Sequence, residues 1–175
     1  SEFYDIVLLH GKIMQKEREA RLKELKKQKW VAVTTQVIEA GVNISATTMI
    51  TEIAPVSSLV QRSGRLLRFD EQDGEMIILY NESKLKRLSE QILDNTDSDR
   101  YDVYSSRSIL ATLNVLKKML NESKKKINWH LPFVCEDNAI GYEVLMESVY
   151  RIDTSINYNR GMLHLMKKIF LSGNV

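Results

Sequence analysis

Short apolar runs alternate with charged, helix-like stretches over the first 80 residues. Four of these runs predict buried strands, and the stretch after the first predicts an exposed helix with opposite charges four residues apart. The predicted strands are Tyr4–Leu9, Trp30–Thr34, Thr48–Ile53 and Glu75–Tyr80, and the predicted helix is Gln15–Lys29. Nearly continuous apolar strands separated by helices are typical of a parallel sheet covered on both faces. This pattern therefore predicts a doubly wound α/β domain.

After residue 80 the strand pattern ends, and apolar residues recur at helical spacing instead. The predicted helices are Lys84–Leu93, Ser108–Leu120, Tyr142–Tyr150 and Arg160–Leu171, and the second has the most regular pattern. The polar stretch Asp94–Arg100 is typical of a linker. We therefore expect three parts: an α/β domain over residues 1–80, a helical linker over 81–103 and a mainly helical region over 104–175.

The overall composition excludes several classes of protein. Apolar residues make up 43% of the 175 residues and charged residues 27%, which argues against a disordered or fibrous chain. The chain has 25 Lys and Arg against 23 Asp and Glu, so its overall charge would attract a polyanion only weakly. A polyanion would have to be bound by a few side chains at specific positions. The single cysteine, Cys135, favours a reducing compartment, and no apolar run approaches the ~20 residues of a membrane span. The sequence thus predicts a cytoplasmic protein, and its three scattered histidines predict no metal site.

The first segment with unusual chemistry follows the second predicted strand. Ligands of open parallel sheets bind at the carboxyl ends of the strands, and this segment lies at such an end. Thr34 and Thr35 offer hydroxyl groups and backbone amides to a phosphate, and Gly41 permits a close backbone approach. Asn43 could hold a ribose hydroxyl or a neighbouring side chain. A strand-to-helix connection capped by a threonine explains the same residues without any ligand.

The second such segment, Ser57–Arg68, predicts a short helix whose start Ser57 or Ser58 caps. Successive residues of a helix are rotated by about 100° around its axis, and this rotation places the apolar and the polar residues of the segment on separate faces. The apolar face would contain Leu59, Ser63, Leu66 and Leu67, and the opposite face Gln61, Arg65 and Arg68. Two arginines one turn apart can bind a phosphate chain, and an arginine aimed at a transferring phosphoryl group stabilises its transition state. The alternative is a solvated arginine face.

Both segments carry a resemblance to one family. Thr35–Asn43 resembles motif V of superfamily 2 helicases, and Gln61–Arg68 resembles the Q-R-x-G-R-x-x-R pattern of motif VI. Ile50–Leu59 and Leu8–Lys12 further resemble the CRISPR-associated helicase–nuclease of type I interference. The resemblance implies that residues 4–80 are the second RecA-like lobe of an ATP-dependent DNA helicase, incomplete at its N-terminus. Over residues 81–175 it is much weaker and suggests only a helical linker and an accessory C-terminal region.

The resemblance also implies roles for individual residues. Arg65 and Arg68 would contact the γ-phosphate of ATP, and Gln61 would position the nucleotide. The implied ATP-binding residues are Gly41, Asn43, Arg65 and Arg68, and the implied nucleic-acid-binding residues are His10, Gly11, Thr34, Thr35 and Gln36. Asn43 departs from the family, which usually has aspartate at this position.

The sequence contains no P-loop. Its one Gly-Lys pair, Gly11-Lys12, is followed by Ile13 and has Ile6 where the first glycine should stand. The acidic stretch Asp70–Asp73 imitates a Walker B box but does not follow an apolar strand. The resemblance therefore implies that ATP and its Mg²⁺ bind mainly to a separate P-loop lobe, and that this chain alone is inactive.

The implied partners are single-stranded DNA, the P-loop lobe, a CRISPR surveillance complex and a nuclease domain, with no membrane. Two alternatives stay open at this point. The chain could be a non-catalytic helicase-like adaptor that binds nucleic acid or a surveillance complex. It could also be an unrelated α/β nucleotide-binding or interaction domain in which both motifs arise by coincidence.

Overall fold

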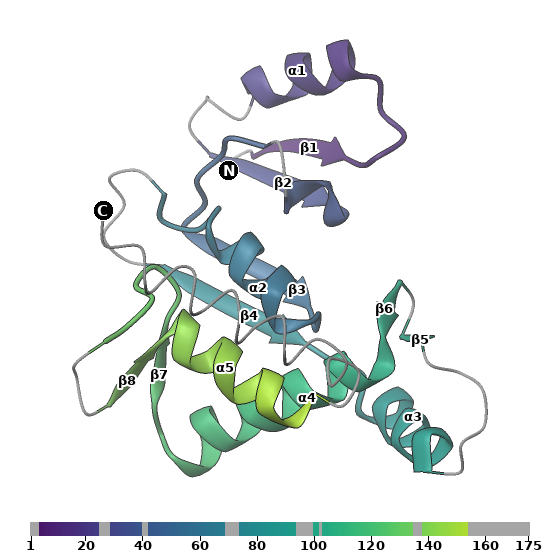
Figure 1. Cartoon of the computed structure of the whole chain (residues 1–175). Coiled ribbons are helices and arrows are strands. Elements are labelled where there is room, and N and C mark those ends of the chain that lie inside the picture. The colour runs from purple at the N-terminus through teal and green to yellow at the C-terminus, as the bar shows by residue number, and fades with distance from the viewer. Residues whose placement is uncertain are drawn as a thin grey trace, which may run out of the picture. The chain divides into compact units, whose positions relative to one another are not determined.

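The computed structural model describes residues 4–24, 29–39, 42–68, 74–93, 100–101, 103–134 and 138–153. The chain divides into two compact units (Figure 1). Unit 1 consists of Ser1–Thr51 and Ser58–Ile78, and unit 2 of Glu52–Ser57 and Leu79–Val175. The architecture is mixed α/β, with small parallel sheets and helices, as the sequence pattern predicts. The predicted helix Arg160–Leu171 lies outside the described residues.

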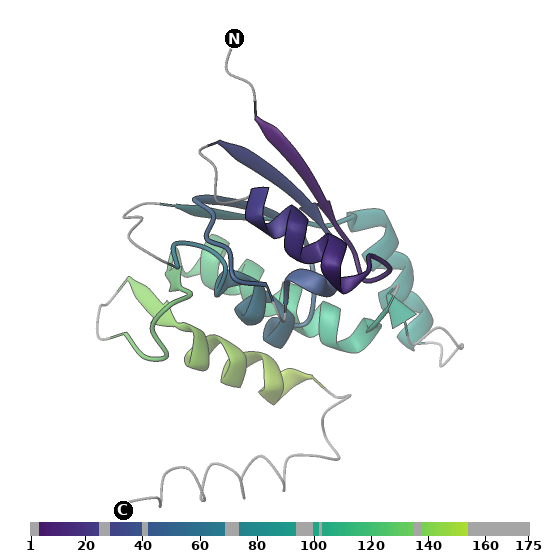
Figure 2. The ribbon, with the colours of Figure 1, turned by 90° about the horizontal axis from the view of Figure 1, so that it is seen from above.

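The first β-α-β unit lies wholly within unit 1. It consists of β1 (Asp5–Leu9), α1 (Gln15–Glu24) and β2 (Trp30–Thr34), followed by a 3₁₀ turn, η1 (Gln36–Ile38). The two strands pair in parallel, in a register that places Asp5 beside Trp30 and Leu9 beside Thr34. Figure 2 shows α1 lying along this strand pair. The strand predictions for this unit are confirmed to within one residue at each end.

A second β-α-β unit contains β3 (Thr48–Glu52), α2 (Val56–Ser63) and β4 (Glu75–Leu79). Its two strands pair with each other. The amide of Glu75 donates to the carbonyl of Thr47 at 2.9 Å, and the amide of Ile53 donates to that of Leu79 at 2.8 Å. Because both bonds advance in the same direction along the two strands, the pair is parallel. In the described part of the chain, β1–β2 and β3–β4 form separate two-stranded ladders.

The core of unit 1 lies on one face of the β1–β2 pair. Its fully buried members are Val7, Leu9, Val42 and Ile44, and partly buried residues including Leu22 of α1 and Trp30 pack against them. The opposite face of the same pair is also apolar but open. It carries Ile6, Leu8, Val31 and Val33, which are 75%, 47%, 45% and 53% exposed. Successive side chains of a strand point to opposite faces of the sheet, so each strand contributes residues to both the buried face and the open face.

The described residues of unit 2 form three longer helices and four very short strands. The elements are α3 (Glu82–Leu93), β5 (Arg100–Tyr101), β6 (Tyr104–Ser105), α4 (Ser106–Lys117), a π-helical turn (Lys118–Glu122), β7 (Lys126–Asn128), β8 (Ala139–Gly141) and α5 (Tyr142–Ile152). The expectation that strands end at residue 80 is therefore wrong. Strands of two or three residues are too short to produce a detectable alternation of apolar and polar positions.

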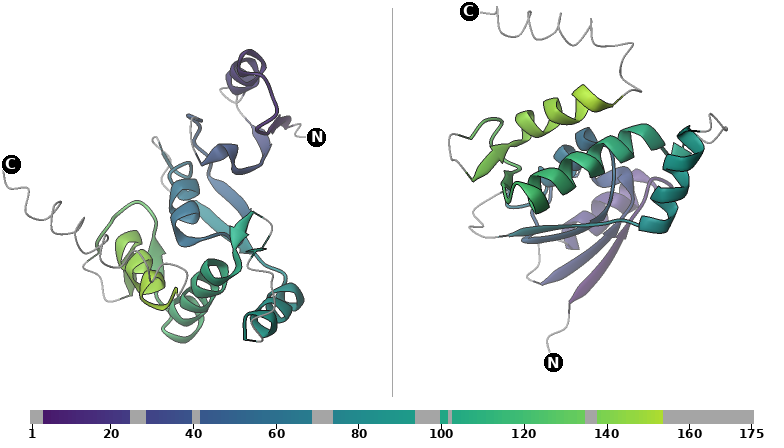
Figure 3. Two further views of the ribbon diagram at one scale, coloured as in Figure 1. Left: turned by 45° about the vertical axis from the view of Figure 1, so that its right-hand side comes forward. Right: turned by 90° about the horizontal axis from the view of Figure 1, so that it is seen from below.

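Helices α4 and α5 contact each other and form the core of unit 2 (Figure 3). Ile109 of α4 and Leu145 of α5 are completely buried, and Val149 is 1% exposed. The short strands complete this unit: β5 and β6 form an antiparallel pair, and β7 and β8 form a parallel one. The apolar spacing that predicted both helices thus corresponds to the faces that are buried.

Gly141, immediately before α5, has no room for a side chain. A Cβ atom there would lie 2.7 Å from the carbonyl oxygen of Leu131 and still closer to the carbonyl group of Pro132. Since these neighbours are backbone atoms, we expect Gly141→Ala to lower the free energy of unfolding of unit 2 by about 1–3 kcal/mol. Urea denaturation followed by Trp129 fluorescence in a Trp30→Phe background measures this change.

The matched control is Gly11→Ala in unit 1. No atom lies within 4 Å of a Cβ placed at Gly11, so this variant should retain its denaturation midpoint when unit 1 is followed by Trp30 fluorescence in a Trp129→Phe background. A Gly141→Ala protein as stable as the parent would show that the connection between β7 and β8 adapts to the extra methyl group.

Candidate nucleotide and nucleic-acid site

Two of the predicted site segments meet at the carboxyl ends of β1 and β2. Because Leu9 lies beside Thr34 in the parallel register, the residues that follow both strands are neighbours. The amide of Thr35 donates to the carbonyl of Leu9 at 3.2 Å and extends the ladder by one bond. The structure thus brings His10 and Gly11 together with the stretch Thr34–Gln36 at one edge of unit 1.

The polar groups at this edge are only partly engaged. The Nδ1 atom of His10 accepts the amide of Lys12 at 3.2 Å, and the hydroxyl of Thr34 donates to the carbonyl of Thr35 at 3.0 Å. Thr35 precedes η1 but makes no side-chain cap bond, so the interpretation of this residue as a helix cap is wrong. The side chains of Thr35 and Gln36 are exposed. The carboxyl edge therefore presents hydroxyl and amide groups to solvent.

Helix α2 ends at Ser63, five residues before the predicted end. The amides of Arg65 and Leu66 donate to carbonyls three residues back, and Leu67 adopts the left-handed region with φ 50°. Leu66 then forms a β-bridge with Ala46. The prediction that Arg65 and Arg68 share a helical face with Gln61 is therefore wrong, because both arginines belong to the loop that follows the helix.

Arg65 ties this loop to the end of η1. Its Nε donates to the carbonyl of Ile38 at 3.2 Å, and its Nη2 donates to that of Glu39 at 3.4 Å. Burial, together with the positive charge of Arg68, lowers the pKa of Arg65 from its ordinary value. The segments that resemble motifs V and VI are thus joined directly. The two guanidinium groups repel each other, and a negative group placed between them would relieve that repulsion.

Arg68 is held by its backbone, and its side chain is exposed. Its amide donates to the hydroxyl of Ser45 at 2.7 Å. Within the described residues, no hydrogen bond or ion pair engages the guanidinium group of Arg68 or the side-chain amide of Gln61. Arg68 therefore presents a full set of donors in a fixed fork, which suits an incoming phosphate.

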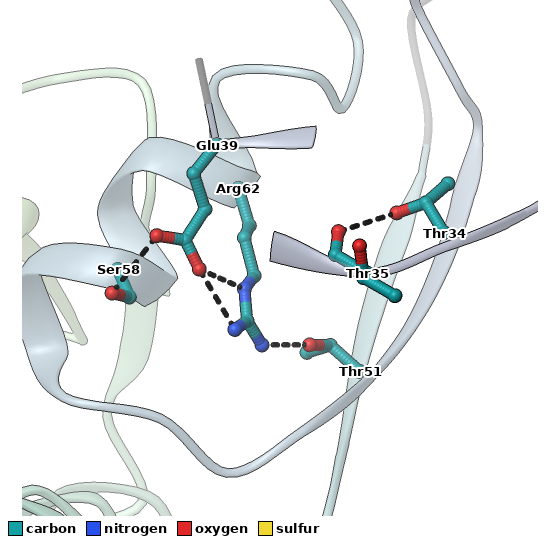
Figure 4. A network of polar contacts seen from close by, with 6 residues as sticks. All are labelled: Thr34, Thr35, Glu39, Thr51, Ser58 and Arg62. Atoms are coloured by element: carbon teal, nitrogen blue, oxygen red, sulfur yellow. Dashed lines mark hydrogen bonds and ion pairs between the residues drawn. The ribbon is translucent and has the colours of Figure 1, made fainter. Parts of the chain in front are cut away.

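A buried ion pair lies beside these arginines and was missed from the sequence (Figure 4). Nε and Nη2 of Arg62 donate to one carboxylate oxygen of Glu39 at 3.0 and 2.8 Å. Nη1 of Arg62 donates to the hydroxyl of Thr51 at 2.6 Å, and Ser58 donates to the second oxygen of Glu39 at 3.2 Å. The side chains of Arg62 and Glu39 are only 11% and 15% exposed. The sequence feature that could have indicated this pair is that Glu39 and Arg62 lie inside the two helicase-like motifs.

The remaining predicted residues are not part of this cluster. Gly41 and the acidic stretch at 70–73 lie outside the described residues, and Asn43 is exposed. Among the residues that the structure describes, no three His, Cys, Asp or Glu side chains gather closely enough to bind a metal. The same residues include no helix that is long and apolar enough to cross a bilayer.

Together these features define the type of fold. Parallel β-α-β units, with polar loops at the strand ends and an arginine loop joined to them, form a RecA-like α/β lobe. Residues 2–71 match the family model "CRISPR-associated nuclease/helicase Cas3, C-terminal". The match covers 70 of the 175 residues, and this part of the chain is therefore similar to the C-terminal region of that family.

Individual proteins are also similar to parts of this chain. The chain is 34% identical over 112 residues to the CRISPR-associated nuclease/helicase Cas3 of Methanothermobacter thermautotrophicus, an alignment that covers 56% of this chain and 14% of that relative. It is 37% identical over 93 residues to the ATP-dependent DNA helicase RecG of Aquifex aeolicus, and this alignment covers 47% of this chain and 12% of RecG. The fold matches the crystal structure of T. fusca Cas3 with a TM-score of 0.55 and 18% identity, over 95% of this chain and 19% of that one. The chain thus spans about a seventh of the Cas3 relative's length.

Proposed function

We propose that this chain supplies the second RecA-like lobe of an ATP-dependent DNA helicase or translocase that acts in CRISPR type I DNA interference, an antiviral defence. The observation that carries the proposal is the junction of the two motifs. Arg65 is anchored on the backbone that follows β2, and the guanidinium group of Arg68 beside it is exposed. The similarity to Cas3 and RecG supports a helicase function for this chain, because one relative is named a nuclease/helicase and the other an ATP-dependent DNA helicase.

The residues present fit the phosphate end of ATP. Bound ATP with Mg²⁺, held mainly by the P-loop lobe, would supply the phosphoryl group that is transferred to water. Arg68 would donate to the oxygens of that group and stabilise the charge that develops on them. Arg65 would hold the loop in place while it adds a second positive charge, and Gln61 would position the nucleotide. Of the other proposed ATP contacts, Asn43 would lie at the ribose side and Gly41 would allow the close approach.

The carboxyl edge of β1 and β2 would bind single-stranded DNA. Its proposed contacts are His10, Gly11, Thr34, Thr35 and Gln36, which combine small, hydroxyl and amide groups. Groups of this kind bind the phosphate backbone without reading the base sequence. Because the same backbone segment continues into η1, which Arg65 holds, DNA contact and ATP contact would be coupled through about five residues. That short connection would let each hydrolysis event change the grip on DNA.

The proposed function also implies a division of the chain into domains and a set of partners. Residues 1–80 would form the lobe, residues 81–103 a linker and residues 104–175 an accessory region. The P-loop lobe would lie elsewhere in the same polypeptide or in a partner chain, and a CRISPR surveillance complex and a nuclease domain would be further partners. The protein would act in the cytoplasm.

A non-catalytic adaptor is the second candidate function. The specific observation in its favour is Asn43, which is exposed and stands where helicases of this family usually have an aspartate. An adaptor would bind nucleic acid or a surveillance complex but would not need charged contacts with ATP. The effect of Arg68→Ala on ATP turnover, argued in the Discussion, separates the two candidates.

The proposal predicts that the 175-residue chain alone hydrolyses ATP no faster than a buffer blank, with or without single-stranded DNA. Adding the P-loop lobe, on the same polypeptide or as a separate chain, should restore DNA-stimulated turnover. Release of inorganic phosphate measures both rates. DNA-stimulated turnover by the isolated chain at a helicase-like rate would refute the assignment of a half-site.

A further inference from the structure

The first turn of α2 obtains its cap from a distant helix. Val56 begins α2, and its amide has no acceptor within the helix. The preceding residue, Pro55, has no side-chain oxygen that could accept it. Instead, the hydroxyl oxygen of Thr112 in α4 accepts the amide of Val56 at 3.0 Å, and Thr112 is completely buried. The prediction that Ser58 caps this helix is wrong, because α2 begins at Val56 and Ser58 lies inside it, where its hydroxyl donates to Glu39.

A second contact holds the same turn from α5. Tyr150 is hydrogen-bonded to the side chain of Ser57. Ser57 is the second residue of α2, so it lies inside the helix and is not its cap either. Burial raises the pKa of Tyr150, against the smaller opposing effect of the Ser57 bond, and Glu143 and Asp153 raise it further. Because the Ser57 bond lowers this pKa, Ser57 is its donor and the oxygen of Tyr150 its acceptor, and the phenol stays protonated across the ordinary pH range.

Helices α4 and α5 are themselves joined behind these two contacts. The hydroxyl of Thr112 donates to the carbonyl of Ser108 at 2.8 Å, and the hydroxyl of Ser108 donates to Asp153 at 2.5 Å. Asp153 directly follows α5 and is only 2% exposed. A continuous chain of hydrogen bonds thus runs from the end of α5 through α4 to the first amide of α2.

Helix α2 belongs to both units. Val56 and Ser57 are counted with unit 2, whereas Ser58–Ser63 are counted with unit 1. The helix is short, about 12 Å along its axis, so a displacement of its first turn displaces its last turn as well. That last turn carries Arg62, and the loop with Arg65 and Arg68 follows directly.

We propose that Thr112 and Tyr150 are positioning residues for ATP turnover: they fix the first turn of α2 and thereby place Arg65 and Arg68. The inference rests on the proposed function of these two arginines. Loss of either hydroxyl leaves a buried polar group without its partner and loosens the start of the helix.

The experiment uses the polypeptide or complex that carries both the P-loop lobe and this chain. Thr112→Val keeps the shape of the side chain and removes the acceptor, whereas Thr112→Ser keeps the hydroxyl. We expect Thr112→Val to lower kcat for DNA-stimulated ATP hydrolysis about tenfold with KM for ATP nearly unchanged, since small misplacements of catalytic groups have effects of this size. Thr112→Ser should restore most of the rate, and Tyr150→Phe should lower kcat in the same direction.

Ser148→Ala is the matched control, because Ser148 lies on α5 but its hydroxyl bonds to Val144 of the same helix. It should leave kcat unchanged. Amide hydrogen exchange on the 175-residue chain provides a readout that needs no ATP: Thr112→Val should speed exchange across Val56–Ser63, and Thr112→Ser should not.

The outcomes separate the two proposals. If Arg68→Ala abolishes turnover but Thr112→Val leaves kcat unchanged, the positioning role is refuted and the proposed function stands. If kcat of Thr112→Val falls only in proportion to the fraction of unfolded protein, the role of Thr112 is merely structural and the inference also fails. If Arg68→Ala leaves turnover unchanged, the proposed function itself is refuted.

Discussion

Replacing Arg68 by alanine is expected to lower DNA-stimulated ATP hydrolysis about 10³-fold in the assembly that contains both helicase lobes. An arginine that reaches a transferring phosphoryl group typically contributes a factor of this size or more. Arg68 fits that role because its side chain is exposed and its backbone is fixed by Ser45. Steady-state phosphate release over a range of ATP concentrations measures the effect, which should fall on kcat more than on KM.

Two further variants make this result specific. Arg68→Lys keeps the positive charge but loses the planar fork of donors, so it should recover only a small part of the rate. Arg87→Ala removes an exposed arginine from α3 and should leave the rate unchanged. Equal rates for Arg68→Ala and the parent would instead favour the non-catalytic adaptor, in which ATP contacts are dispensable.

Arg65 should respond differently from Arg68, although both belong to the same motif. Its guanidinium group already donates to the carbonyls of Ile38 and Glu39 and so holds the loop itself. A loss of Arg65 would therefore combine a missing charge with a displaced loop. Arg68 is the cleaner test of the chemistry, because no hydrogen bond in the described part of the chain depends on its side chain.

Local patterns were enough to predict most of this fold. The strands β1 and β2 follow from their apolar runs, and their parallel register brings His10 beside Thr35 without any further assumption. The helices α4 and α5 follow from residues such as Ile109 and Leu145, whose spacing places them on one buried face. Periodicity is reliable here because each element is long enough to repeat its pattern.

What the sequence could not predict depends on partners far along the chain. The cap of α2 comes from Thr112, 56 residues beyond Val56, where no local rule would place it. The early end of α2 depends on the bridge between Leu66 and Ala46. Side-chain pairing across such separations is decided by tertiary packing, which a single sequence does not display.

The pair of Arg62 and Glu39 is the clearest case, and it has the largest expected effect on stability. We expect Arg62→Met to lower the free energy of unfolding of unit 1 by about 3–5 kcal/mol, because it leaves the carboxylate of Glu39 buried without its partner. Trp30 lies in β2 and Trp129 in the β7–β8 connection, so a Trp129→Phe background leaves a single fluorophore that reports on unit 1. Urea denaturation followed by Trp30 fluorescence then measures the change.

A double variant separates the charge effect from the loss of packing. In Arg62→Met combined with Glu39→Leu, neither charge remains buried, so the double variant should be more stable than Arg62→Met alone. Arg151→Met, followed by Trp129 fluorescence in a Trp30→Phe background, is the control for unit 2, since Arg151 forms an exposed pair with Glu147 and should cost no more than about 0.5 kcal/mol. If Arg62→Met costs as little as this control, water screens the Arg62–Glu39 pair. The contact between the two helicase motifs would then depend on the backbone bonds of Arg65 alone.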